Sequence, residues 1–264
     1  MNGETTPRRL GVVSFLNAKP LIAGLERDDA VELIFAVPSR LPGMLESGEI
    51  EVGLVPVIDI GQRRDRWRIV SDACIGCDGE TLTVRVFSRV PAERITRLHV
   101  DGDSHTSVAL ARIIWREMYN TDLEILPYTE AAAAEDCHAV LLIGDKVVNH
   151  GLIGYDMQTD LGSAWKSLTS LPFVFAAWAA QVGTELGDIE SRLRAARDRG
   201  IASAEMIAAD FGPGMGWPVA LAKRYLSARL RFTIEDRYVE AMDRFFELAA
   251  KHKVIVESEA PAIS

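Results

Sequence analysis

Short apolar runs separated by polar, helix-like stretches mark the beginning of the chain. The runs cover residues 10–13, 31–37 and 51–56, and each is rich in aliphatic side chains. Such runs are typical of buried strands, and strands that alternate with helices form parallel sheets. We therefore expect an α/β protein whose first part is a parallel, doubly wound sheet.

A second α/β unit is expected from about residue 91. It follows a strict alternation of apolar and polar residues from Thr81 to Phe87, which predicts a half-buried strand. Strands at 99–101, 123–126 and 139–143, a helix over 106–119 and an alanine run at 131–134 then make a small βαβ lobe. The apolar segment 171–180 is expected to return as a strand to the first lobe, and the rest is expected to be helical, with a break at Gly200.

These patterns predict two lobes joined by two crossings of the chain. One lobe comprises residues 1–90 and 176–264, and the other comprises residues 91–175. In this arrangement a ligand lies in the cleft between the lobes and is touched by loops of both. Solute-binding proteins close over their ligands in this way by a hinge motion.

Composition narrows the class of protein and of partner. The 264 residues carry a formal net charge of −9, which argues against a nucleic-acid surface, and the basic segment 63–68 is interpreted as solvated surface. The apolar segment 171–180 is about half as long as a bilayer-spanning helix, and no secretion signal is recognised, so we expect no membrane partner. Three cysteines indicate no disulfide framework and favour a reducing cytoplasm.

The first candidate site is the polar elbow from Ser14 to Asn17, which follows the strand at 10–13. Pro20 suits the start of a helix, so the carboxyl end of a strand faces the amino end of a helix. Small ligands of open α/β sheets bind at such junctions, where free N–H groups point into the crevice. The alternative is an ordinary turn that carries an asparagine.

The second candidate site is a hydroxyl-rich turn before the helix predicted over 106–119. Its hydroxyls and unpaired N–H groups suit a carboxylate or a phosphate, although simple N-capping explains them equally well. The candidate binding residues of this turn are Ser104, His105, Thr106 and Ser107.

Three further residues carry weaker signals. Thr83 lies on the polar face of its strand, where its hydroxyl bonds either a ligand or a neighbouring strand. Gly144 and Asp145 stand at the carboxyl end of a strand, where a backbone N–H can approach a ligand, but Asp145 equally suits the cap of the next turn.

Other reactive side chains give little support for a metal or redox site. Cys74 and Cys77 form a single C-x-x-C without nearby histidines, and His105 and His150 are interpreted as ordinary loop or cap residues. The chain contains none of the common nucleotide, hydrolase or zinc-protease motifs. We therefore expect no metal and no cofactor.

Several of these segments together resemble a known enzyme family, the chorismate dehydratases of the futalosine route to menaquinone. The resemblance rests on VSFLNAKP at 13–20, LESGEIEVGLVP at 45–56, DSHTSVALA at 103–111, LLIGD at 141–145, DLG at 160–162 with Trp165, and LPFVFAAW at 171–178. The segments occur in the family's order and span residues 13–178, whereas the helical remainder matches in character only.

The resemblance implies a two-lobed fold like that of type II periplasmic binding proteins, used as a cytoplasmic enzyme. The implied reaction is a hydro-lyase reaction without a cofactor, from chorismate to 3-[(1-carboxyvinyl)oxy]benzoate and water. Asn17, Thr83 and the turn at 104–107 would surround the carboxylates and the leaving hydroxyl, with Asn17 as the catalytic residue. Ser14, Gly144 and Asp145 would complete the substrate site.

Three positions depart from the family pattern. Phe15 stands where tyrosine is common, Val57 follows Pro56 where serine is expected, and Thr83 stands where serine is expected. Thr83 keeps a hydroxyl, but Val57 loses one, so a substrate contact at Val57 is not expected.

Three alternatives stay open. The first is a non-catalytic binding protein for small anions, and the second is the related dihydroxynaphthoate synthase of the same pathway, which would carry a different opening motif. A ligand-sensing domain of a regulator is the third and would need a DNA-binding appendage. The sequence leaves monomer and homodimer equally open.

Overall fold

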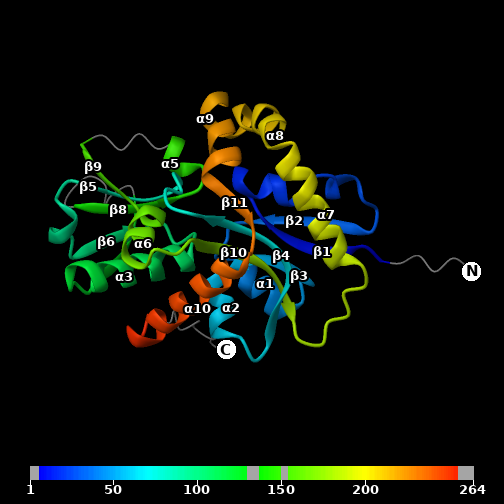
Figure 1. Cartoon of the computed structure of the whole chain (residues 1–264), viewed down its shortest axis with the longest axis horizontal. Helices are drawn as coiled ribbons and strands as arrows, with labels where there is room; N and C mark the ends of the chain where they lie inside the picture. The colour runs from blue at the N-terminus through cyan, green and yellow to red at the C-terminus, as the bar shows by residue number, and fades with distance from the viewer. Residues whose placement is uncertain (1–5, 130–136, 150–153, 255–264) are drawn as a thin grey trace, which may run out of the picture.

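The computed structural model of the chain describes residues 6–129, 137–149 and 154–254 (Figure 1). The expected alanine run at 131–134 and His150 lie outside these residues. Among the described helices, none combines the length and the apolar character that a membrane crossing requires.

The first sheet has six strands in the order β11-β4-β10-β3-β1-β2. Strands β1, β2 and β3 are parallel, which confirms the doubly wound start, whereas β10 runs antiparallel to its neighbours β3 and β4. The strands are β1 (Arg8–Val13), β2 (Val31–Ala36), β3 (Val52–Pro56), β4 (Trp67–Cys77), β10 (Phe173–Gln181) and β11 (Leu230–Thr233).

The second sheet has five strands in the order β7-β6-β8-β5-β9. Strand β6 pairs in parallel with β7 and β8, and β5 runs antiparallel to β8 and β9. The strands are β5 (Val84–Ser88), β6 (Arg97–Val100), β7 (Glu124–Pro127), β8 (Ala139–Ile143) and β9 (Met157–Asp160).

Helices cover both sheets, and the C-terminal segment with α9 and β11 lies between them (Figure 1). The α-helices are α1 (Leu41–Ser47), α2 (Val57–Gln62), α3 (His105–Tyr119), α5 (Lys146–Asn149), α6 (Leu161–Thr169), α7 (Ile189–Ala202), α8 (Ala204–Phe211), α9 (Val219–Arg224) and α10 (Asp236–Lys251). Shorter helical segments are η1 (Leu16–Ile22), η2 (Leu25–Arg27), η3 (Ala92–Arg94), η4 (Pro213–Met215) and the π-helical η5 (Tyr225–Arg229).

Sheet membership divides the chain into the two lobes. Strand β10 returns to the first sheet, as expected, but β5 pairs within the second sheet although it precedes the expected boundary at residue 90. We therefore propose that the chain crosses between lobes at 78–83 and 161–172. One large apolar core joins the lobes, with Trp115, Trp165 and Trp178 fully buried in it, and a smaller apolar cluster around Val140 lies in the second lobe.

Four local expectations are wrong. The helix expected from Pro20 is the 3-10 segment η1, which starts at Leu16 and contains Pro20. The segment 63–68 is not all solvated surface, because Arg63 is buried and Trp67 begins β4. The region expected to be wholly helical contains β11. Gly200 does not break a helix, because it lies inside α7, where a Cβ would meet the Pro20 carbonyl oxygen at 1.8 Å.

Candidate active site

A narrow cavity of about 40 Å³ lies where the two sheets and the C-terminal segment meet. Its polar lining consists of one amide, four aliphatic hydroxyls and one phenol, from Asn17, Thr81, Thr83, Ser104, Ser107 and Tyr225. The remaining lining residues are Val13, Phe15, Pro38, Pro56, Ile75, Val84, Ile143, Gly144, Phe175, Ala176 and Leu230. No charged side chain lines this cavity among the residues that the structure describes.

Asn17 reaches the cavity from the turn after β1, where the sequence places its polar elbow. Its side-chain oxygen Oδ1 is buried and has no hydrogen-bond partner within the described residues. A buried acceptor without a donor destabilises the folded state by about 1–3 kcal/mol, so a ligand that donates to it would relieve this cost. Asn17 therefore presents an acceptor that a ligand can satisfy.

Thr83 is held in place by the crossing that leads into β5. The carboxylate of Asp160 accepts from the backbone N–H groups of Thr81 at 3.0 Å and Leu82 at 2.8 Å, and Leu82 has a φ of +71°. A branched residue with positive φ is uncommon, so this carboxylate stabilises an otherwise costly turn. The turn directs the buried Thr83 hydroxyl to the phenol oxygen of Tyr225, at 2.6 Å.

The side chains of the hydroxyl-rich turn at 104–107 face two directions, two toward the cavity and two toward α2. Ser104 is the N-cap of α3, where its Oγ accepts from the Ser107 N–H at 3.2 Å and donates to the Ser107 Oγ at 2.9 Å. Both serines line the cavity. Thr106 instead accepts from the Ile58 N–H of α2 at 3.3 Å, and His105 faces Asp59 of α2, so these two residues join the lobes.

Gly144 lines the cavity, whereas Asp145 lies beside it. The Gly144 N–H donates to the Thr83 carbonyl at 2.9 Å, and the Phe15 ring packs directly against Gly144. The Asp145 carboxylate accepts from the Leu16 N–H and, at 2.8 Å, from the indole N–H of Trp217. Burial raises the pKa of Asp145, although the hydrogen bonds from Trp217 and Leu16 lower it.

Two other positions are not brought to the cavity. Ser14 is exposed and is absent from the described lining, although its backbone N–H continues the pairing with β2. Val57 is buried at the first turn of α2 and is also absent from that lining, in agreement with its loss of a hydroxyl.

Two polar residues of the lining, Thr81 and Tyr225, were not predicted as site residues. Tyr225 enters the cavity from η5. This residue is buried, and its ring stacks on Trp217 with centroids 4.8 Å apart and planes 15° apart. It lies in the helical remainder, where no motif marked any position. The only local signal is an aromatic residue within an apolar helical pattern, which ordinarily indicates core packing.

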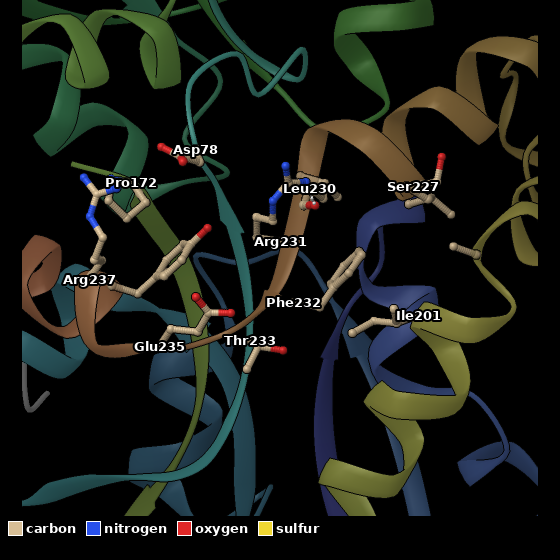
Figure 2. Close-up of a pocket in the computed structure, with 13 residues that line it drawn as sticks. Asp78, Pro172, Ile201, Ser227, Leu230, Arg231, Phe232, Thr233, Glu235 and Arg237 are labelled. Carbon is tan, nitrogen blue, oxygen red and sulfur yellow. Dashed lines mark hydrogen bonds between the residues drawn. The ribbon is translucent and has the colours of Figure 1, made fainter. Parts of the chain in front are cut away.

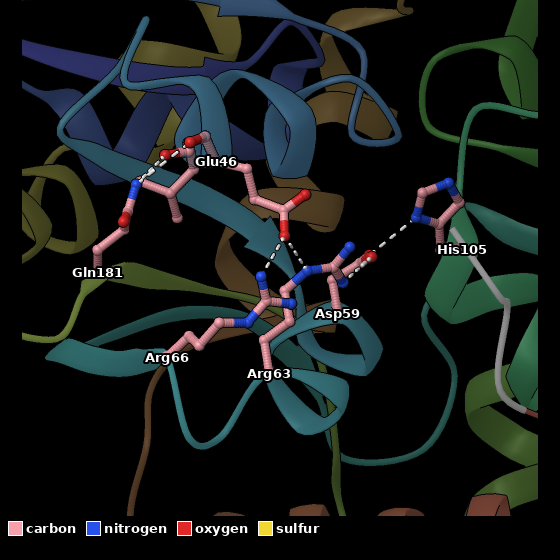
Figure 3. Close-up of polar contacts among 7 residues, drawn as sticks. Glu46, Asp59, Arg63, Arg66, His105 and Gln181 are labelled. Atoms are coloured by element: carbon pink, nitrogen blue, oxygen red, sulfur yellow. Dashed lines mark hydrogen bonds and ion pairs between the residues drawn. The ribbon is translucent and has the colours of Figure 1, made fainter. Parts of the chain in front are cut away.

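A charged network lies behind the hydroxyl-rich turn and joins α1, α2 and α3 (Figure 3). Glu46 accepts from Arg63 at 2.8 Å and lies 3.4 Å from Arg66. The Asp59 carboxylate lies 3.2 Å from Nη1 of Arg63 and 2.8 Å from Nδ1 of His105. Because Asp59 and Arg63 are buried, this network fixes α2 against the start of α3 and so positions the two serines of the cavity.

A wider pocket of about 370 Å³ lies beside β11, away from the predicted site residues (Figure 2). Charged side chains of both signs surround it, among them Asp78, Arg231, Glu235 and Arg237. Arg237 already donates to the Ser170 carbonyl at 2.8 Å. The pocket beside β11 has the greater volume, but the predicted site residues converge in the narrow cavity. We therefore place the candidate site in the narrow cavity.

Known proteins resemble the chain over nearly its whole length. A chorismate dehydratase of Thermus thermophilus is 27% identical over 255 residues, which cover 87% of this chain and 90% of that protein. A solved protein of Archaeoglobus fulgidus superposes with a TM-score of 0.74 at 16% identity, over 96% of this chain and 100% of that one. A Candida albicans protein described as having the generic periplasmic binding protein fold superposes with a TM-score of 0.62 at 12% identity, over 96% and 92%.

The solved structures confirm the expected fold class, an α/β fold of two lobes like that of periplasmic binding proteins. The sequence model of a family described as menaquinone biosynthesis matches residues 8–251, which is most of the chain. The chain therefore belongs to the menaquinone biosynthesis family.

Proposed function

We propose that this protein is a chorismate dehydratase that converts chorismate to 3-[(1-carboxyvinyl)oxy]benzoate and water. The family and the Thermus thermophilus relative support this activity. The observation that carries it at the site is the meeting of Asn17, Thr83, Ser104 and Ser107 in one uncharged cavity between the lobes. We place the reaction in the futalosine route to menaquinone, as a hydro-lyase step that needs no cofactor.

The chemistry requires stabilisation of negative charge on the ring carboxylate of chorismate. The hydrogen at C3 is vinylogous to that carboxylate, so charge from the broken C3–H bond spreads onto its oxygens. Hydroxyls and backbone N–H groups at the start of α3 supply donors for this charge, and preorganised donors are worth about 10²–10³-fold in rate. Ser104 and Ser107 are the residues to which we assign this role.

We assign the proton acceptor to the substrate itself. The described lining offers hydroxyls and an amide but no carboxylate, histidine or lysine. The enolpyruvyl carboxylate of chorismate, carried on C3, then takes the C3 proton, the C4–O bond breaks, and the leaving hydroxide receives that proton to become water. The proton transfer is then intramolecular, and Asn17 positions this edge of the ring so that the C3–H and the carboxylate are aligned for it.

The substrate enters only when the lobes move apart. A cavity of about 40 Å³ is far smaller than the roughly 300–1,000 Å³ of ordinary small-molecule sites. The contacts between α2 and α3 and between Leu16 and Asp145 cross from lobe to lobe and must loosen during opening.

The remaining proposals concern setting and partners. We propose a cytoplasmic protein, because Cys74, Cys77 and Cys137 are all unpaired thiols. We propose chorismate, a dicarboxylate, as its partner, with no nucleic-acid or membrane partner, and either a monomer or a homodimer as its assembly.

The test is to incubate the purified protein with chorismate, without added metal or nucleotide, and to separate the products by chromatography with mass detection. A product lighter than chorismate by one water, with a benzoate-like ultraviolet spectrum, is the expected result. Chorismate that is bound but not converted would contradict the proposal and favour a binding protein of the same fold. Turnover of a futalosine-derived substrate instead would favour the dihydroxynaphthoate synthase.

A further inference from the structure

We propose that Tyr225 is a catalytic residue whose phenol binds the leaving C4 hydroxyl of chorismate together with the side-chain oxygen of Asn17. This inference rests on the proposed function and assigns the part of the substrate that each of the two groups contacts. It adds to the site a residue from the C-terminal segment, which carries no recognisable motif.

The first support is the position of the phenol oxygen. Tyr225 is 1% exposed, and its oxygen lies 2.6 Å from the Thr83 hydroxyl at the cavity wall. The Asn17 side chain lines the same cavity and acts on this phenol, because it lowers the pKa of Tyr225 against the effect of burial. Asn17, Thr83 and Tyr225 thus form one cluster, although they come from residues far apart in the sequence.

The second support is a count of donors and acceptors in this cluster. When the Thr83 hydroxyl donates to the phenol oxygen, which is one of the two directions that their 2.6 Å hydrogen bond allows, the phenol proton is left to donate to another group. The Asn17 Oδ1 beside it is a buried acceptor without a partner among the described residues. The cluster therefore offers a ligand one donor and one acceptor side by side.

Only one group of chorismate complements this pair. Both carboxylates are ionised at neutral pH and only accept hydrogen bonds, and the ether oxygen also only accepts. The C4 hydroxyl both donates and accepts, so it can donate to Asn17 and accept from Tyr225. A carboxylate in the same place would set its oxygen against the Asn17 oxygen.

The third support is that the phenol is fixed in place and remains protonated. Tyr225 stacks on Trp217, whose indole N–H donates to Asp145 at 2.8 Å. Burial raises the pKa of Tyr225 above its ordinary value, so the phenol is a hydrogen-bond donor at neutral pH. Trp217 and Asp145 are accordingly positioning residues.

The role in the reaction follows from the charge on the leaving oxygen. As the C4–O bond lengthens, negative charge grows on that oxygen, and the Tyr225 hydrogen bond stabilises it. The proton that completes the water comes from C3 through the enolpyruvyl carboxylate, so the phenol keeps its own proton. By holding the C4 hydroxyl, Asn17 also fixes the neighbouring C3 substituent that takes the proton.

The test compares Tyr225→Phe with Tyr238→Phe, which removes the hydroxyl of another buried tyrosine, in α10 and outside the cavity lining. We expect Tyr225→Phe to lower kcat by roughly 10²-fold and Tyr238→Phe to leave it within about twofold. Because the phenylalanine ring still stacks on Trp217, the unfolding temperature is expected to change little.

A second measurement identifies the contact itself. The inhibition constant of 4-deoxychorismate, which lacks the leaving hydroxyl, is compared with the KM of chorismate in both proteins. The wild type is expected to prefer chorismate by about tenfold or more, and Tyr225→Phe is expected to lose most of this preference. An equal preference in the two proteins, or a wild-type kcat in Tyr225→Phe, would overturn the role of Tyr225. Failure of the wild type to dehydrate chorismate would instead overturn the proposed function.

Discussion

Gly144 illustrates how a single residue position shapes the candidate site. It has a φ of +59°, a conformation that residues with a side chain rarely adopt, and a Cβ there would meet the Phe15 ring at 2.6 Å. Phe15 belongs to the first lobe and Gly144 to the second, so this contact lies across the cavity wall. Glycine is required here both by the backbone and by the closeness of the two lobes.

Replacement of this glycine tests both requirements. We expect Gly144→Ala to destabilise the protein and to lower kcat/KM, because the new methyl group displaces Phe15 from the cavity wall. Gly48→Ala is the matched control, since Gly48 also has a positive φ, of +73°, but no atom within 4 Å of an added Cβ. Urea unfolding should show a loss of about 1–2 kcal/mol for Gly48→Ala and a larger loss for Gly144→Ala. Equal losses and an unchanged kcat/KM would show that the Phe15 contact does not matter.

Residue types alone indicated four of the six polar residues that line the cavity. Asn17, Thr83, Ser104 and Ser107 were predicted and do line the cavity, and their roles stay predictions. His105 gave the same local signal but faces α2, because neighbouring positions of a helix point in different directions and only the packing partner decides between them. Tyr225 could not be found, since its role depends on contacts with residues more than a hundred positions away.

At the scale of elements, α10 is fastened to α3 by a charged contact. The Glu117 carboxylate of α3 lies 2.5 Å from Nζ of Lys251 and 2.5 Å from Nε2 of His252, both at the C-terminal end of α10. Hydrogen bonds from Lys251 and then His252 hold the pKa of Glu117 below its ordinary value of 4.5. The ionised form therefore stabilises the fold above that ordinary value, and the stabilisation disappears as the pH falls through the lowered pKa.

Removal of this carboxylate should therefore have a pH-dependent effect. We expect Glu117→Gln to lower the free energy of unfolding at pH 7 by about 0.5–1 kcal/mol, and this difference should shrink as the solution becomes acidic. Urea titrations of the wild type and the variant across this pH range measure the effect. Glu240→Gln, which removes an exposed carboxylate of α10, serves as the charge-matched control. A difference that stays constant with pH would show that the ionised carboxylate is not responsible.

Local periodicity predicted elements whose environment is uniform along their length. The apolar runs that became β1, β3, β8 and β10 are mostly or wholly buried strands, which hydrophobic pattern alone can identify. The run that became β2 was identified by its β-forming residues, although its side chains are only half-buried or exposed. The long strand β4 was missed because Arg68 and Ile69 are exposed and Asp72 is half-buried, so neither alternation nor a continuous apolar run appears. Strand β11 has only four residues and depends on pairing with β4.

At the scale of the whole molecule, the two sheets bury much of the polar cluster, since Thr83, Ser107 and Tyr225 are almost fully buried. Burial strengthens hydrogen bonds to developing charge, which suits a reaction that has no charged side chain in the described lining. The two-lobed architecture was predictable because it follows from the order of strands and helices. The position at which the chain crosses to the second lobe, just before β5, was not predictable, because the pattern of a strand does not reveal to which sheet it belongs.

The small volume of the cavity predicts a change of shape on binding. We expect the radius of gyration of the ligand-free protein, measured by small-angle X-ray scattering, to exceed that calculated from this structure. Addition of 3-[(1-carboxyvinyl)oxy]benzoate should bring the two values together as the lobes close. A ligand-free protein whose radius of gyration already equals the value calculated from this structure, and does not change when ligand is added, would contradict the proposed opening.

The central claim is that the cavity at Asn17 is where chorismate loses water, and the kcat of Asn17→Ala tests it most directly. The account predicts a loss of about 10²-fold or more in kcat with an unchanged fold, because the variant no longer positions the reacting edge of the ring. Asn120→Gly removes an amide at the C-terminal cap of α3, where a φ of +53° favours glycine, and should keep wild-type turnover. An Asn17→Ala protein that dehydrates chorismate as fast as the wild type would contradict the account.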